Sequence, residues 1–307
     1  MIKYDRKYKL QLEKNPRAYG DPVPTDPAAF ATIELPYTLE FTISRGAMSA
    51  ANTASFTVYN LSQKTREQVF FDQFNMDQYK SAKLWAGYGD SLSLVFNGNI
   101  QQSWSHKPSG SNNVLTEIQA REGAFQIANG YTTQQFNGSQ SYDEVLKRLC
   151  LDMPFMDTPI VSKRDNKPVR SCALSGNTWK LIETYSNGDA TIDNNRIVIV
   201  KEYECIGSTA LLINAETGLL GSPYRANKTL EFTTLFTPQL EIGMAVRIES
   251  QINPQLNGFY KVVGFTHNGT ISSAVAGDAT TTVQLWLGMQ TLTWASSGKP
   301  VDPGKTA

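Results

Sequence analysis

The sequence has 307 residues, more than one hydrophobic core usually supports, so we expect two or more compact units. Its 28 basic and 28 acidic side chains cancel, which excludes a strong overall attraction to DNA or to an anionic membrane surface. A net charge near zero also removes one barrier to self-association.

The cysteines and the apolar runs indicate a chain that folds in a reducing compartment. Cys150, Cys172 and Cys205 are too few and too scattered for a disulfide framework, and we interpret them as reduced structural thiols. The charged first residues lack the apolar core of a signal peptide, and no run approaches the roughly 20 apolar residues of a spanning helix. We therefore expect folding in a cytoplasm without membrane insertion.

Residues 1–36 are predicted to form an N-terminal extended arm. The segment from Asn15 to Pro36 contains five prolines and few large apolar residues. Because proline lacks an amide hydrogen and fixes φ, this density excludes a helix or a central strand.

A first antiparallel β-barrel is predicted over 37–138. Large apolar and polar residues alternate from Tyr37 to Ser44, which is the period of a half-buried strand. Ser62 is a suitable N-cap for a short helix from Gln63 to about Phe71. The dipeptide Asn97-Gly98 predicts a tight turn, because both residues tolerate positive φ. Further strands are predicted at 54–60, 81–88, 92–96, 100–105 and 114–120.

A small α+β insertion is predicted over 139–210. Ser141 and Glu144 match the capping box of a helix that ends near Cys150. A second helix is predicted from about Thr178 to Tyr185, with Gly188 as its stop, and a strand at 196–200.

A second antiparallel β-barrel is predicted over 211–295, and a flexible tail over 296–307. Its strands are predicted at 230–235, 245–250, 260–266 and 281–287. Six Asn-Gly dipeptides in the whole chain indicate many tight turns and little helix. The predicted fold class is therefore mainly β, with two similar barrels and a small α+β insertion between them.

Two ordered sets of motifs resemble the hub proteins of phage tail baseplates. The first set is Tyr-Asn-Leu-Ser at 59–62, Ala-Gly-Tyr at 86–88 and Phe-Asn-Gly-Asn-Ile at 96–100. The second is Glu-Thr-Gly-Leu-Leu-Gly-Ser-Pro at 216–223, Leu-Phe-Thr-Pro at 235–238, Asn-Gly-Phe-Tyr-Lys-Val at 257–262 and Thr-His-Asn-Gly at 266–269. The resemblance covers about two thirds of the chain and leaves the arm and the insertion without matching motifs.

The resemblance implies a homotrimer in which each copy contributes two similar barrels. Six barrels in a ring would fit a six-fold tail tube on one face and a three-fold spike on the other. The implied partners are the tail tube, the spike and other baseplate proteins, with DNA passing through the lumen. The implied location is the baseplate of a virion tail, assembled in the host cytoplasm.

Three residues are interface candidates. Leu219 and Leu220 lie between Gly218 and Gly221, in a pattern typical of a protruding apolar loop, although both leucines could instead enter the barrel core. Phe236 presents the same two alternatives, and for it the core is favoured.

We expect no catalytic residue, no cofactor and no metal site. The two histidines, His106 and His267, lack the spacing of a zinc site, and we interpret His267, before Asn268-Gly269, as a turn residue. No serine lies in a Gly-x-Ser-x-Gly elbow, although a triad assembled in space stays open. The pair Glu202 and Glu204 is typical of a solvated strand face, so a cell-wall hydrolase is the weaker alternative.

Two further expectations concern ligands. The five tryptophans could form sugar-stacking platforms, which leaves a receptor- or carbohydrate-contacting tail module as the alternative function. For the hub function we expect a lumen of neutral or mildly acidic surface, because a surface that binds DNA would slow its passage.

Overall fold

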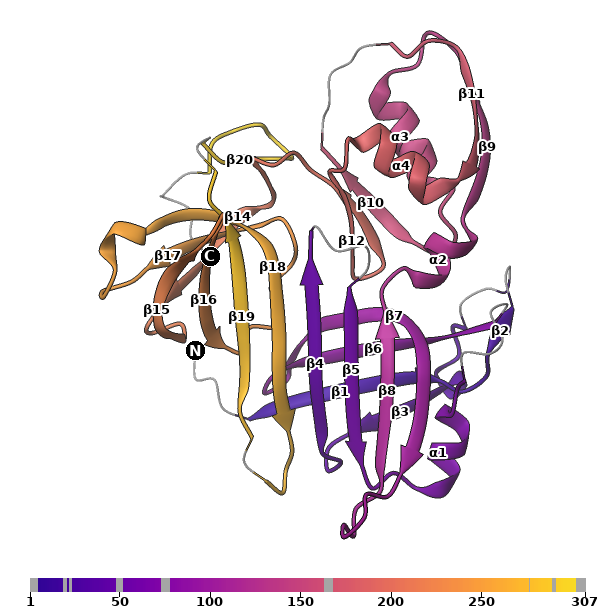
Figure 1. The fold of residues 1–307 in the computed structure, drawn as a ribbon, viewed down its shortest axis with the longest axis vertical. Helices are drawn as coiled ribbons and strands as arrows, with labels where there is room; N and C mark the ends of the chain where they lie inside the picture. The colour runs from indigo at the N-terminus through magenta and orange to yellow at the C-terminus, as the bar shows by residue number, and fades with distance from the viewer. Residues whose placement is uncertain are drawn as a thin grey trace.

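A computed structural model describes residues 5–18, 21, 24–47, 52–72, 78–162, 168–275, 277–288 and 291–301. As predicted, the chain is mainly β (Figure 1). Two β units lie side by side, and a small α+β unit extends beyond the upper end of the first. No described helix has the length and apolar character needed to cross a membrane.

The first β unit is built from strands in the first 121 residues and encloses one hydrophobic core. Helix α1 (Gln63–Val69) begins at the predicted N-cap, where the Ser62 hydroxyl accepts from the Thr65 amide. The strands are β1 (Arg6–Glu13), β2 (Arg17–Ala18), β3 (Phe30–Glu34), β4 (Leu39–Gly46), β5 (Thr53–Tyr59), β6 (Gln78–Tyr88), β7 (Ser91–His106) and β8 (Leu115–Arg121).

The predicted extended arm is wrong over most of its length. Strand β1 pairs with both β3 and β6, and Leu10 and Leu12 are fully buried in the core of the first β unit. Pro16, Pro24 and Pro27 lie between β1 and β3, and Pro36 follows β3, so none of these four prolines removes a ladder hydrogen bond. Their density therefore marked a loop between two strands and not a separate arm.

The predicted turn at Asn97-Gly98 is also wrong, because β7 runs without a break through these residues. The turn lies earlier, at Gly89 and Asp90, and Gly89 has a φ of 58°. A Cβ at Gly98 would lie 2.6 Å from the carbonyl oxygen of Arg121. Glycine is therefore required at this position for the close approach of two backbones.

The α+β unit has its own core, which includes Phe136, Trp179 and Ile182. The predicted capping box of Ser141 and Glu144 is present, and Asn187 and Gly188 end the second predicted helix in left-handed conformations. The elements are α2 (Ala124–Asn129), β9 (Tyr131–Phe136), α3 (Tyr142–Leu151), β10 (Asp157–Val161), β11 (Cys172–Asn177), α4 (Thr178–Ser186), β12 (Ala190–Asp193) and β13 (Arg196–Ile199). Because β9 pairs with β11, this unit includes residues that precede the predicted start at 139.

The second β unit begins before residue 211, because β14 starts inside the stretch predicted as the insertion. Its elements are β14 (Glu204–Asn214), β15 (Leu219–Ala226), β16 (Thr229–Leu235), β17 (Met244–Glu249), β18 (Gly258–Ile271), β19 (Ala279–Trp286) and β20 (Thr293–Trp294). Val301 is buried against Trp294, so the predicted flexible tail is wrong up to this residue, and 302–307 lie outside the described residues.

The two β units repeat one strand order. In the first unit the order is β4-β5-β8-β7-β6-β1, and in the second it is β15-β16-β19-β18-β17-β14. The last pair differs in direction, since β1 is antiparallel to β6 whereas β14 is parallel to β17. The repeated order is the structural basis for calling the two units similar.

A single sheet runs through both β units. The first residues of β18 pair with β17, and residues Gly264 to Ile271 leave that strand and pair with β4 of the first unit. The strand pairings thus join the two units edge to edge. We call the β18·β4 contact the internal seam.

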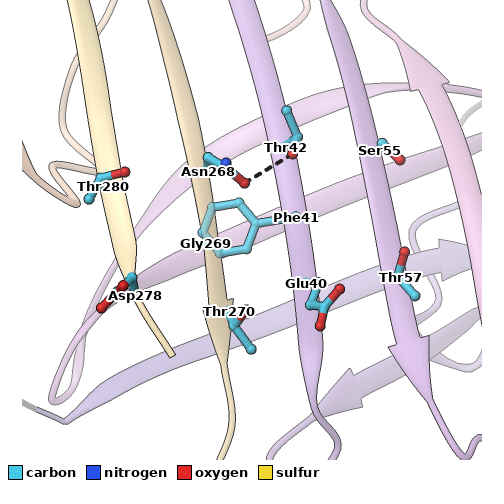
Figure 2. A pocket seen from close by; sticks show the side chains of 10 residues that line it. All are labelled: Glu40, Phe41, Thr42, Ser55, Thr57, Asn268, Gly269, Thr270, Asp278 and Thr280. Atoms are coloured by element: carbon cyan, nitrogen blue, oxygen red, sulfur yellow. Dashed lines mark hydrogen bonds between the residues drawn. The ribbon is translucent and has the colours of Figure 1, made fainter. Parts of the chain in front are cut away.

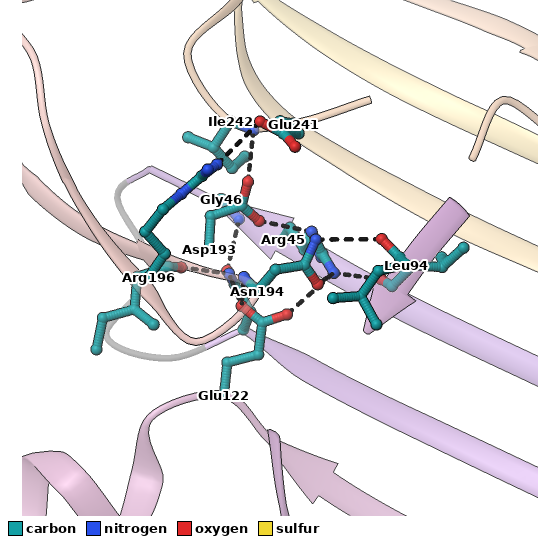
Figure 3. Close-up of polar contacts among 12 residues, drawn as sticks. Arg45, Gly46, Leu94, Glu122, Asp193, Asn194, Arg196, Glu241 and Ile242 are labelled. Carbon is teal, nitrogen blue, oxygen red and sulfur yellow. Dashed lines mark hydrogen bonds and ion pairs between the residues drawn. The ribbon is translucent and has the colours of Figure 1, made fainter. Parts of the chain in front are cut away.

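A buried ionic network ties all three units together (Figure 3). Arg45 of β4 pairs with Glu122, which follows β8, at 3.0 Å and with Asp193 of β12 at 2.5 Å. The other carboxylate oxygen of Asp193 accepts the Ile242 amide of the second β unit at 3.1 Å. Because these groups are almost fully buried, the guanidinium fixes the relative position of the units that hold the candidate surface.

Candidate interaction surface

One face of the continuous sheet is polar and exposed over six neighbouring strands. In β16, β19, β18, β4, β5 and β8, buried apolar residues alternate with outward-facing polar ones, as a sheet with one solvated face requires. We call this the open face. Its outward-facing polar side chains include Glu40, Thr42, Ser44, Thr53, Ser55, Thr57, Glu117, Gln119, Arg121, Glu231, Thr233, Thr266, Asn268, Thr270, Thr280, Thr282 and Gln284.

The open face is mildly acidic. Within these six strands its charged side chains are three carboxylates, from Glu40, Glu117 and Glu231, and one guanidinium, from Arg121. Thr42 donates to Asn268 at 3.1 Å, a side-chain hydrogen bond that crosses the internal seam. The surface offers hydroxyls and amides for water and gives phosphate groups little attraction.

A shallow hollow of about 330 Å³ lies on the open face, across the internal seam (Figure 2). Its walls carry hydroxyl groups from β4, β5, β18 and β19, together with Glu40 and Asp278, whereas the Phe41 ring points into the core. Glu40 already accepts the Tyr59 hydroxyl at 2.8 Å. No group of His, Cys, Asp and Glu residues able to hold a metal occurs in the described part of the chain.

The two histidines lie in different environments, one buried and one exposed. His267 is not the predicted turn residue, because it lies within β18 and is buried, with its Nδ1 at 2.8 Å from the Thr281 hydroxyl. Burial, together with Arg45, lowers the pKa of His267 to about 3, so its ring is neutral. His106 is exposed and pairs with Glu117 at 3.6 Å.

The predicted interface residues lie in different places. Leu220 is exposed, and it is paired with Thr233 and so lies beside the open face. Leu219 points the other way and packs partly against the core of the second β unit. Phe236 is fully buried against Phe41, so it offers no surface in this chain.

No tryptophan is fully exposed. Trp179 and Trp294 are buried, and the remaining three are half-buried. The Trp286 indole donates to Glu202 at 2.7 Å, which holds its ring in place. Each of the three half-buried tryptophans therefore offers only part of its ring for stacking on a sugar.

The open face was not predicted from the sequence, although the sequence contains a signal for it. The polar residues of each predicted strand alternate with the apolar ones, and most are threonine, serine, asparagine or glutamine. What the sequence did not reveal was which strands are neighbours, because pairings such as β18·β4 join residues more than 200 positions apart.

The sequence model of the family described as Baseplate hub gp41 matches residues 25–271, which is most of the chain. The chain belongs to the Baseplate hub gp41 family. It is therefore a structural protein of a phage tail baseplate, in agreement with the resemblance seen in its motifs. No curated protein matches its sequence at a significant level.

Three solved structures are similar to this hub protein. The tail protein from Neisseria meningitidis MC58 has a TM-score of 0.57 at 12% identity, and the match covers 97% of this chain and 100% of that one. The 43 kDa tail protein of prophage MuSo2 from Shewanella oneidensis has a TM-score of 0.54 at 10% identity, covering 91% and 98%. The lidded Francisella PdpA-VgrG complex has a TM-score of 0.57 at 9% identity, covering 100% and 55%. At these identities the likeness shows the fold alone.

Proposed function

We propose that three copies of this hub protein form a ring that adapts a six-fold tail tube to a three-fold spike. The observation that carries the proposal is the repeated strand order, which places two similar β units in each chain. Three chains then present six similar units to the tube, while the rest of each chain keeps three-fold symmetry. The same ring would contact the other baseplate proteins.

The open face is proposed to line the lumen of this ring. It is a broad polar face of the continuous sheet, and it crosses the boundary between the two β units without interruption. Its mildly acidic, hydroxyl-rich surface would let DNA pass without holding it. The α+β unit lies beyond one end of the sheet, away from the middle of this face (Figure 1).

Mass measurement in solution tests the proposed stoichiometry. Purified protein, alone and mixed with tail tube and spike proteins of the same phage, is analysed by size-exclusion chromatography with light scattering. We expect a mass of three copies, and a complex in which three copies bind six tube subunits. A protein that stays monomeric alone and with both partners would contradict the proposal.

A further inference from the structure

We infer that the strand edge of β15 pairs with the last residues of β7 in a second copy of this chain, in a seam that repeats the internal one. The inference rests on the proposed trimer and deepens it, because it names the two edges and their register. Strands β15 and β7 flank the six strands of the open face, one at each end. In a ring, one end of each copy meets the other end of the next.

The repeat between the two β units extends to single residues. Seven consecutive pairs join β5 to β8, and seven join β16 to β19, so that Tyr59–Leu115 corresponds to Leu235–Thr280. Both following strands contain a bulge at the same place. It lies between Ile100 and Gln102 in β7, and between Val262 and Gly264 in β18.

This correspondence predicts which residues of β7 and β15 would pair between two copies, if that contact repeats the internal seam. Within the chain, Asn268 of β18 is paired with Thr42 of β4. His106 corresponds to Asn268, since it pairs with Leu115 of β8 as Asn268 pairs with Thr280 of β19. Tyr224 corresponds to Thr42, since it lies opposite Glu231 on the neighbouring strand. The transferred seam therefore places His106 of one copy opposite Tyr224 of the next.

Part of the β7 edge is covered by Phe71, which lies two residues beyond the end of α1. The amide and carbonyl of Ser103 both bond to Phe71, so this edge is occupied up to Ser103. In the transferred register Ser103 would face Asn227, which lies just beyond the end of β15 at Ala226. The pairing with Phe71 therefore ends where β15 of the next copy would begin, and among the described residues no strand pairs with this edge from Trp104 onward.

The side chains on the two edges fit a covered position better than a solvated one. Tyr224 is 53% exposed and Leu220 is 40% exposed, on a face otherwise made mainly of small polar residues. Trp104 and His106 stand at the opposite end of the same face. Unpaired strand edges with large exposed side chains favour association through backbone hydrogen bonds.

Cysteine cross-linking tests the register directly. His106 and Tyr224 are expected to form a non-hydrogen-bonded pair, whose Cα atoms lie about 4.5 Å apart, within the range of a disulfide. The double variant His106→Cys/Tyr224→Cys is made in a Cys172→Ser background, since Cys150 and Cys205 are buried. Oxidation followed by a non-reducing gel should give a covalent trimer.

Two further variants serve as matched controls. Thr42→Cys/Asn268→Cys places the same pair across the internal seam and should form a disulfide within one chain. His106→Cys/Arg225→Cys moves one cysteine by one residue to the opposite face of β15, and should give about tenfold less covalent trimer.

The outcomes separate this inference from the proposed function. The inference would be overturned if light scattering shows a trimer and the internal seam cross-links, but His106→Cys and Tyr224→Cys do not cross-link. The proposed trimer would then still stand. Cross-linked ladders beyond three copies would support the seam and contradict the three-copy ring. A protein that is monomeric under all conditions would overturn both.

Discussion

Arg45 is the residue on which the relative position of the three units most depends. Its guanidinium contacts Glu122, Asp193 and the carbonyl oxygen of Val95, and it lies against the Phe265 ring. Two carboxylates therefore share one cation in a site closed to water. Such a network holds the three units in one relative position, because separating them would leave unpaired charges in a buried site.

Replacing Arg45 is expected to destabilise the protein severely. Arg45→Met leaves the carboxylates of Glu122 and Asp193 without their cation, which should cost roughly 3–5 kcal/mol of unfolding free energy. Chemical denaturation measures this loss. Lys7→Met, which removes an exposed ion pair with Asp90, is the control and should leave the unfolding midpoint unchanged. Equal midpoints for the two variants would contradict the role given to Arg45.

Glu122 and His267 give stability opposite dependences on pH. Burial raises the pKa of Glu122 from 4.5 to about 7, so its contribution is present below 4.5 and is lost as pH rises through about 7. Burial lowers the pKa of His267 from 6.5 to about 3, so its contribution is present above 6.5 and is lost as pH falls toward 3. The two effects oppose each other between 4.5 and 6.5.

Replacing His267 should therefore reveal the pH dependence of stability that Glu122 causes. In His267→Gln we expect the unfolding free energy to rise as pH is lowered from about 8 to about 5, because the buried Glu122 carboxylate takes up a proton. Denaturation at several pH values measures this slope. In His267→Gln/Glu122→Gln the slope should be absent, and the same slope in both variants would show that another group causes it.

At the scale of elements, local signals in the sequence predicted α1, α3 and α4, whereas α2 was missed. Ser62, the Ser141–Glu144 capping box and Asn187-Gly188 all act through residues a few positions away, so the chain itself carries the information. Asn-Gly was less reliable, because glycine serves two purposes. At Gly98 it allows close contact with Arg121 inside a strand, and the sequence does not distinguish this use from a turn.

The edge strand β15 gives a prediction for assembly. Leu220→Asp puts a charge on the exposed side of this strand, so it should weaken trimer formation and leave the melting temperature nearly unchanged. Leu230→Asp, on the adjacent strand β16, is the contrast, because Leu230 is fully buried and its replacement should lower the melting temperature strongly. Light scattering and thermal denaturation of both variants measure these effects. An unchanged trimer in Leu220→Asp would remove this residue from the interface.

At the scale of the whole molecule, the sequence predicted two β units but not that one sheet runs through both of them. Period-two patterns identify strands, but they do not say which strands meet, and the seam joins residues of β4 and β18 from opposite ends of the chain. The N-terminal strand β1 was missed for a related reason. Its place between β3 and β6 depends on pairing with distant residues, while the nearby prolines favoured an arm.

We expect the open face to have low affinity for nucleic acid. Filter binding with double-stranded DNA should show no micromolar affinity and no steep dependence on salt, because this face carries more carboxylates than cations. The variant Ser55→Lys/Thr57→Lys/Thr282→Lys makes the same face basic and should gain salt-dependent binding. Tight, salt-sensitive binding by the unaltered protein would contradict a passive lumen.

An electron cryomicroscopy map of the assembled baseplate tests the central claim most directly, because it gives both the number of copies and the direction of the open face. We predict three copies whose six β units form a quasi-six-fold ring, with Thr42, Ser55, Asn268 and Thr282 facing the axis. A ring of another copy number, or one in which these residues face outward, would contradict the account.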